Sequence, residues 1–229
     1  VEEPIEIRNL KIKNIGNREQ ILEVTGSFEP IISTQIQDIS HPVFNDLFLR
    51  NEFENENIII ERRQRDKNAE KIFLATTLFT ENETIGDIEY ELDKEKFFGR
   101  GNIQLPEMIK NSKPFSKIVG LITEPIIALK RTLKVMPGEE VDLNLIIAVS
   151  DTKEKAQKYV NEYKNQAKIK KNFQLEKLKS MEEIRYLGIK GTDTRDYKKL
   201  MSLLIVQNEL KKNYIKNNNT YSQSDLWKF

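Results

Sequence analysis

The first 150 residues alternate apolar and polar side chains with a period of two, which is typical of β-strands. In residues 5–36 this pattern surrounds the pair Gly16-Asn17, which predicts two strands joined as a hairpin. The triplet Met136-Pro137-Gly138 predicts a second hairpin, because proline presets the first turn dihedral and glycine tolerates positive φ. Further strands are expected at residues 57–62, 71–79, 87–92, 125–135 and 140–150. Such strands predict an antiparallel, sandwich-like domain.

The hydrophobic period changes to about 3.6 after Ser150, which predicts helices. Asp151 or Thr152 can cap a first helix, which we expect to run without a break to Gly188. Thr192-Asp193-Thr194 can cap a second helix over residues 195–214. The polar tail that follows has no clear period and is expected to be a loop.

The amino-acid composition limits the kinds of binding and catalysis that the chain can perform. The chain has 37 Lys and Arg against 36 Asp and Glu, so its net charge of +1 gives no overall attraction for polyanions. The lysines of residues 164–179 are interspersed with acidic neighbours and lack interleaved aromatic residues, which argues against nucleic-acid binding. With no Cys and a single His, disulfides, thiolate nucleophiles and metal centres are not expected. Any chemistry must use carboxylates, Arg, Lys, Tyr and the backbone.

The longest apolar runs, residues 143–149 and 203–206, are much shorter than the roughly 18 residues of a membrane span. No secretory signal opens the chain, so we expect a cytoplasmic location and no membrane contact. The first residue is Val1 rather than Met, which suggests a piece of a longer protein.

Seven stretches in order along the chain resemble one enzyme family, glycoside hydrolase family 94, formerly glycosyltransferase 36. They are LEVTGSFEPIIS (22–33), HPVFNDLFLRNEF (41–53), FFGRG (97–101), GLITEPIIALKRTLKVMPGE (120–139), AVSDTKEKAQKYVNEY (148–163), EEIRYLGI (182–189) and SQSDLW (222–227). The resemblance is greatest to the branch of 1,2-β-oligoglucan phosphorylases and the C-terminal part of cyclic β-1,2-glucan synthases.

The resemblance implies a fold. Such enzymes have a galactose mutarotase-like, antiparallel β-supersandwich, a helical linker, an (α/α) barrel that carries the active site, and usually a homodimeric assembly. By this resemblance, residues 1–150 are the later part of the supersandwich, 151–191 the linker, and 192–229 the truncated start of the helical catalytic region. The catalytic acid is then expected beyond Phe229. No catalytic residue is therefore expected in this chain, which we predict to be inactive alone.

The resemblance also implies a reaction, inverting phosphorolysis or synthesis of β-glucosidic bonds. Inorganic phosphate attacks the anomeric carbon while a carboxylic acid protonates the departing oxygen. The implied partners are a β-glucan oligosaccharide and phosphate as co-substrate, with no other cofactor. The sequence leaves open the glycosidic linkage and whether the enzyme is a free-standing phosphorylase or part of a synthase. An alternative reading is a non-catalytic carbohydrate-binding or structural module, which for sugar binding requires exposed aromatic residues on one sheet face.

Three places are candidate substrate-binding sites. Arg100 lies between Gly99 and Gly101 just after a predicted strand, where a tight turn could present a guanidinium to phosphate or sugar oxygens. The plainer interpretation is an exposed turn. His41 precedes Pro42 and could reach a ligand, although a structural turn is the simpler explanation. Trp227 could stack on a sugar ring or pack in a core.

Overall fold

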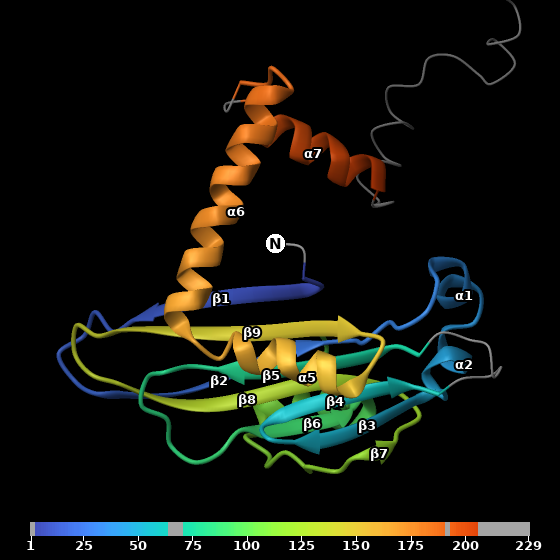
Figure 1. The fold of residues 1–229 in the computed structure, drawn as a ribbon. Coiled ribbons are helices and arrows are strands. Elements are labelled where there is room, and N and C mark those ends of the chain that lie inside the picture. The colour runs from blue at the N-terminus through green and yellow to red at the C-terminus, as the bar shows by residue number, and fades with distance from the viewer. Residues whose placement is uncertain (1–2, 64–70, 191–192, 206–229) are drawn as a thin grey trace, which may run out of the picture. The chain divides into compact units, whose positions relative to one another are not determined.

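The computed structural model describes residues 3–63, 71–190 and 193–205. Figure 1 shows strands over most of the chain up to residue 150 and helices after it. The strands are β1 (Ile5–Lys13), β2 (Gln20–Phe28), β3 (Leu49–Glu54), β4 (Asn57–Arg62), β5 (Phe73–Phe79), β6 (Glu89–Asp93), β7 (Gly120–Leu121), β8 (Pro125–Val135) and β9 (Glu140–Ser150). The helices are α1 (Gln35–Ser40), α2 (Pro42–Asp46), α3 (Lys94–Phe98), α4 (Glu107–Lys110), α5 (Lys153–Glu162), α6 (Gln166–Tyr186) and α7 (Thr194–Ile205).

The strands form two sheets with antiparallel pairing. A six-stranded sheet has the order β1-β9-β5-β4-β3-β7, and a three-stranded sheet has the order β2-β8-β6. The prediction of a β-rich chain with antiparallel, sandwich-like sheets is confirmed. None of the described helices is long and apolar enough to span a membrane.

The two predicted hairpins are wrong. β1 pairs with β9 and β2 pairs with β8, so each tight turn carries the chain from one sheet to the other. The two turns bond to each other instead: Gly138 N–H donates to the Asn14 carbonyl at 2.8 Å, and Asn14 N–H donates to the Glu139 carbonyl at 2.9 Å. A period of two identifies the buried face of a strand but not the strand that completes its hydrogen bonds.

One hairpin, between β3 and β4, was not predicted from the sequence. β3 pairs with β4 through Asn55 and Glu56, which both have positive φ, at 51° and 61°. A two-residue turn of this kind matches the twist of the flanking strands but is unfavourable for glutamate. The Glu56 carboxylate accepts from Arg131 at 3.0 Å and its carbonyl accepts from Thr77 at 2.7 Å, and these contacts stabilise the turn.

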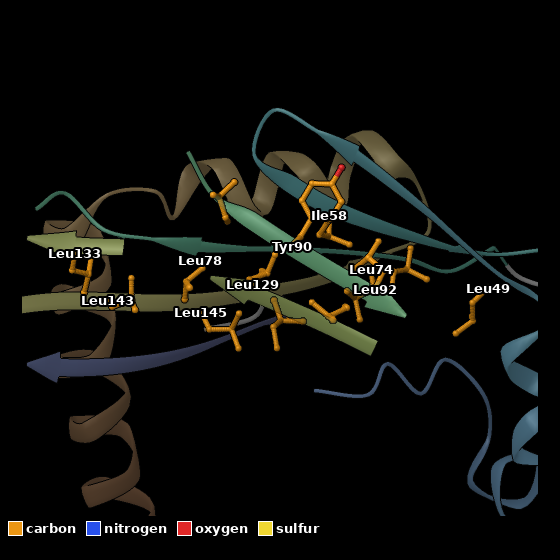
Figure 2. Close-up of a cluster of buried hydrophobic side chains, with 14 of the residues drawn as sticks. Leu49, Ile58, Leu74, Leu78, Tyr90, Leu92, Leu129, Leu133, Leu143 and Leu145 are labelled. Atoms are coloured by element: carbon orange, nitrogen blue, oxygen red, sulfur yellow. The ribbon is translucent and has the colours of Figure 1, made fainter. Parts of the chain in front are cut away.

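The main core fills the space between the two sheets. Figure 2 shows its leucines and isoleucines pointing inward from strands of both sheets. Ile58, Leu129 and Leu133 have no exposed surface. A second cluster packs α5 and Ile169 of α6 on the opposite face of the large sheet, and a third packs α3 and α4 beside β8. The inner faces of both sheets are therefore closed to solvent.

The predicted long helix after Ser150 is interrupted. Thr152 is the N-cap of α5 and accepts from Lys155 N–H at 3.4 Å, in agreement with the predicted cap. α5 ends at Glu162 with Tyr163 as its C-cap, and Asn165 then accepts from Lys168 N–H at 2.9 Å at the start of α6. Asparagine favours such caps, which compete with helix continuation. Gly188 has a φ of 66° just beyond α6, as the predicted helix end requires.

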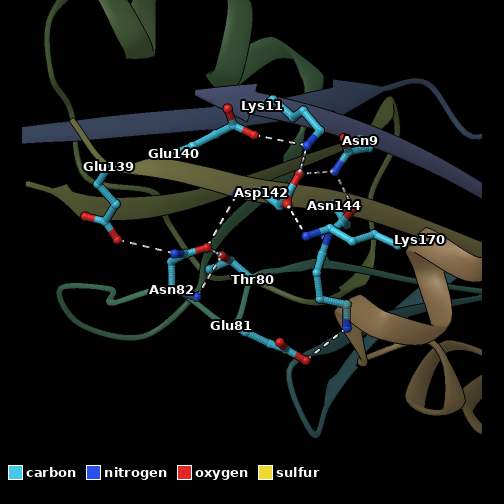
Figure 3. Close-up of polar contacts among 11 residues, drawn as sticks. Asn9, Lys11, Thr80, Glu81, Asn82, Glu139, Glu140, Asp142, Asn144 and Lys170 are labelled. Atoms are coloured by element: carbon cyan, nitrogen blue, oxygen red, sulfur yellow. Dashed lines mark hydrogen bonds and ion pairs between the residues drawn. The ribbon is translucent and has the colours of Figure 1, made fainter. Parts of the chain in front are cut away.

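A polar network attaches the start of α6 to the large sheet (Figure 3). Asp142 on β9 pairs with Lys170 at 3.2 Å and with Lys11 at 3.4 Å. The buried Asn144 donates to Gln166 Oε1 at 2.7 Å, and Gln166 N–H donates to Glu81 at 2.9 Å. Despite the opposing effect of its burial, hydrogen bonds from Asn9 and Lys170 lower the pKa of Asp142, so it stays charged within this network.

The chain divides into two compact units, residues 1–172 and 173–229. The first unit contains both sheets, α5 and the first turns of α6. The second contains the rest of α6 and the amphipathic α7, which starts at Thr194 within the predicted capping triplet. The proposed boundaries at residues 150 and 191 remain predictions, and residues 206–214 of the predicted second helix lie outside the described part.

Candidate functional site

The Gly99–Gly101 segment follows a short helix rather than a strand. β6 ends at Asp93, whose side chain caps α3 by accepting from Lys96 N–H at 3.2 Å. Phe97 is 1% exposed and fixes α3 against the third core cluster. The helix has only five residues, too few for a 3.6-residue period to be visible in the sequence. The prediction that Arg100 comes just after a strand is therefore wrong, because the helix α3 lies between β6 and Gly99.

Both glycines are required by close contacts. Gly99 has a φ of 52°, and a Cβ on it would lie 2.5 Å from Oε2 of Glu107. A Cβ on Gly101 would lie 2.6 to 2.8 Å from three backbone atoms, in Leu105, Glu107 and Phe98. Real Cβ contacts are not this short, so larger residues at either position must displace their neighbours. The loop is tightly packed rather than merely flexible.

Gly101→Ala is expected to destabilise the protein by about 1–3 kcal/mol, the usual cost of overpacking, because backbone cannot move aside as a flexible side chain can. Gly26→Ala is the matched control, since a Cβ there meets only side-chain atoms at 3.7 Å or more. Urea unfolding of the two variants and the wild type gives the comparison. Equal stabilities of the two variants would contradict the packing described for Gly101.

Arg100 is exposed, and its backbone rather than its side chain is held. Its N–H donates to Glu107 Oε2 at 3.0 Å. In the described ranges, no hydrogen bond or ion pair engages the Arg100 guanidinium. This bond and an ion pair from Lys113 at 2.9 Å lower the pKa of the Glu107 carboxyl, which therefore stays charged. The loop therefore has a hydrogen-bonded backbone at Arg100 and an exposed guanidinium.

His41 is an exposed junction residue between α1 and α2. Its N–H donates to the Gln37 carbonyl at 2.9 Å, and its carbonyl accepts from Asn45 N–H at 3.2 Å. Within the described residues, no hydrogen bond or ion pair links it to the Gly99–Gly101 loop. The described residues contain no group of three acidic or His side chains that could hold a metal ion. Trp227 lies outside the described residues.

The same helix pair carries an unusual carboxyl group. Burial raises the pKa of Asp46 to about 6 from 3.8, and the neighbouring acidic groups Asp38, Glu29 and Glu124 add to the shift while Lys94 opposes it. The folded state thus binds the Asp46 proton more tightly than the unfolded chain does. Stability is consequently lost as pH rises through this interval, because the charged form is disfavoured by burial.

Asp46→Asn is expected to raise the melting temperature at about pH 7.5 and to leave it almost unchanged at about pH 4, where the wild-type group is largely protonated in the fold. The effect should be small because the group is partly solvated. Melting curves of both proteins across this pH range measure it. An equal shift at both pH values would show that charge at Asp46 is not the cause.

Two buried cationic side chains on β8, Lys130 and Arg131, form ion pairs within the sandwich. Lys130 is 6% exposed and pairs with Glu23 at 3.4 Å and Glu89 at 3.2 Å. Arg131 is 8% exposed, pairs with Glu56, and donates to the Leu78 carbonyl at 3.1 Å. Both cations are therefore bonded to partners within the sandwich.

Comparison with known proteins adds a family match to this geometry. The family model "Glycosyl hydrolase 94, supersandwich domain" matches residues 1–166. The cyclic beta-(1,2)-glucan synthase NdvB of Rhizobium meliloti (strain 1021) is 22% identical over 207 residues. The match covers 89% of this chain and 7% of that protein, so the chain spans only a small part of the relative's length.

Proposed function

Since residues 1–166 place this chain in the glycosyl hydrolase 94 family, through its supersandwich domain, we propose that it serves an enzyme that makes or phosphorolyses β-glucosidic bonds with inversion. The chain is a domain of a carbohydrate-active enzyme. The proposed substrates are β-1,2-linked glucan and inorganic phosphate, with no further cofactor. The family match carries this proposal, and the name of the relative supports the β-1,2 linkage.

The exposed Arg100 suits a phosphorolytic reaction. Phosphate replaces the water of an inverting hydrolase as the nucleophile, so the enzyme needs cationic hydrogen-bond donors where a hydrolase has a catalytic base. A guanidinium offers paired donors in a planar fork that matches phosphate geometry. The tightly packed loop around Gly99 and Gly101 supports this role, because it limits the backbone positions from which Arg100 can reach.

The general acid is proposed to belong to a helical barrel beyond Phe229. In that arrangement the sandwich supplies a scaffold, and the Arg100 loop reaches an active site, either that of its own chain or that of the partner subunit in a homodimer. A rigid loop with an exposed arginine suits such a contact, since arginine is enriched at protein interfaces. A cytoplasmic location remains a prediction.

A non-catalytic sugar-binding module is less well supported. Such a module needs a platform of exposed aromatic side chains on one sheet face. Among the described strands only Phe53 is an exposed aromatic residue, and its ring stacks on the buried Tyr90 at 4.4 Å. A single aromatic side chain in this setting provides no platform for a sugar chain.

The 229-residue chain alone is expected to release no sugar phosphate from β-1,2-glucan oligomers and phosphate, because the proposed acid lies outside it. The complete enzyme should release it under the same conditions. A coupled assay for glucose 1-phosphate measures both. Turnover by the 229-residue chain above a protein-free blank would contradict the proposal that the catalytic acid lies outside it. A complete enzyme that is folded but inactive would contradict the proposed substrates.

A further inference from the structure

The Glu107 carboxylate accepts a hydrogen bond from the Gly99–Gly101 loop. Oε2 accepts the Arg100 N–H at 3.0 Å. Oε1 accepts from Lys113 Nζ at 2.9 Å and from Asn111 Nδ2 at 3.4 Å. One side chain thus joins the loop that carries Arg100 to the segment that follows α4.

Glu107 also explains the glycine before Arg100. Its Oε2 lies 2.5 Å from the position that a Cβ on Gly99 would occupy, and its own Cβ and Cδ lie 3.1 Å from that position. The carboxylate therefore packs directly against the Gly99 backbone. Any other residue at position 99 would displace the group that holds Arg100.

The two ends of this arrangement are fixed on the core. Phe97 precedes the loop and Met108 follows Glu107, and they are 1% and 6% exposed in the same cluster. The segment between them is exposed at Arg100 and buried at Pro106. The Glu107 backbone is therefore held next to a buried residue, so its carboxylate is a firm support for the loop.

Lys113 forms an ion pair with the Glu107 carboxylate, which affects how that carboxylate interacts with Arg100. A free carboxylate beside Arg100 would be expected to pair with the guanidinium of that same residue. Here Lys113 and Asn111 bond to Oε1 and the Arg100 backbone bonds to Oε2, and within the described residues no hydrogen bond or ion pair joins the guanidinium to this carboxylate. The carboxylate holds the Arg100 main chain while its ion pair is with another cation, Lys113.

We propose that Glu107 is a positioning residue for Arg100, fixing the loop backbone while Lys113 competes with the guanidinium for the carboxylate. This inference rests on the proposed role of Arg100 toward phosphate. The expected consequence is a split in kinetics: variants at Glu107 and Lys113 should raise KM for phosphate more than they lower kcat, because the defect is in presenting a binding group.

The first test measures the Arg100 contact in the 229-residue chain by amide hydrogen exchange. Glu107→Ala should speed exchange at the Arg100 amide by about tenfold or more, as loss of a charge-assisted hydrogen bond implies, whereas Glu107→Gln keeps an acceptor and should give a smaller increase. Glu95→Ala is the control, since Glu95 is an exposed glutamate of α3 with no side-chain bond to the described residues. Unchanged exchange in Glu107→Ala overturns the proposed support.

The second test measures phosphate kinetics in the complete enzyme. KM for phosphate should rise about tenfold in Glu107→Ala and several-fold in Lys113→Met, with recovery in Glu107→Gln and no change in Glu95→Ala. If Glu107→Ala shows faster Arg100 exchange but a wild-type KM, Glu107 contacts the Arg100 backbone without positioning it for phosphate, and the positioning role is overturned. If Arg100→Ala itself is kinetically silent, the proposed role of Arg100 toward phosphate fails, and this outcome is distinct from the failure of Glu107 alone. Should Glu107→Ala not fold, Glu107→Gln tests the contact through its smaller increase in Arg100 exchange, and Lys113→Met tests the kinetics through its several-fold rise in KM for phosphate. Wild-type values in both variants overturn the proposal.

Discussion

Arg100→Ala in the complete enzyme is expected to lower phosphorolysis by roughly 10- to 100-fold or more, since loss of a charged hydrogen bond costs about 1.5–3 kcal/mol. Folding should hardly change, because the Arg100 side chain is exposed and makes no hydrogen bond or ion pair within the described part of the chain. Steady-state kinetics with phosphate as the varied substrate, on enzyme with an unaltered melting temperature, measures the effect.

Arg100→Lys provides the matched control for charge. Lysine keeps the positive charge but loses the planar fork, so recovery should be partial. If the loop is only a solvent-facing turn, both substitutions should change activity and stability by less than about 0.5 kcal/mol. Wild-type catalytic efficiency in Arg100→Ala would contradict the role proposed for this loop.

Leu129→Ala is expected to have the largest effect on stability, a loss of about 2–5 kcal/mol, because it removes a buried side chain from the centre of β8 and leaves a cavity between the sheets. Leu129 is 0% exposed in the main cluster, and its strand pairs with both β2 and β6. Urea unfolding followed by circular dichroism measures the change.

Leu121→Ala is the control for this leucine. Leu121 is 62% exposed on the two-residue strand β7, so its removal should change stability by less than about 0.5 kcal/mol. A loss for Leu129→Ala no larger than that of the control would mean that the two sheets do not share the tightly packed core described above.

The strand positions were predictable where apolar runs are long and end at clear turn residues. β8 and β9 have the predicted bounds, 125–135 and 140–150, and the last strand ends at Ser150, where the hydrophobic period changes. The pairing was not predictable. The turn at Gly16-Asn17 looks the same in sequence whether its strands bond to each other or, as they do here, to strands far away along the chain.

The candidate site was only partly visible in the sequence. Glycines on both sides of Arg100 indicated a tight turn, and the close contacts at Gly99 and Gly101 explain why they are there. Glu107 was missed because it lies outside the Gly-Arg-Gly motif and no periodic pattern links it to Arg100. Its one available signal was an acidic residue after Pro106, which is common at helix starts and so pointed to a cap.

The most direct test of the proposed function is the anomeric configuration of the sugar phosphate that the complete enzyme forms from β-1,2-glucan oligomers and inorganic phosphate. Inverting attack by phosphate on a β-glucosidic bond must yield α-glucose 1-phosphate, which proton NMR of the fresh reaction mixture identifies. We expect this anomer, formed only when phosphate is present. Release of free sugar without phosphate incorporation, or formation of the β anomer, would contradict it.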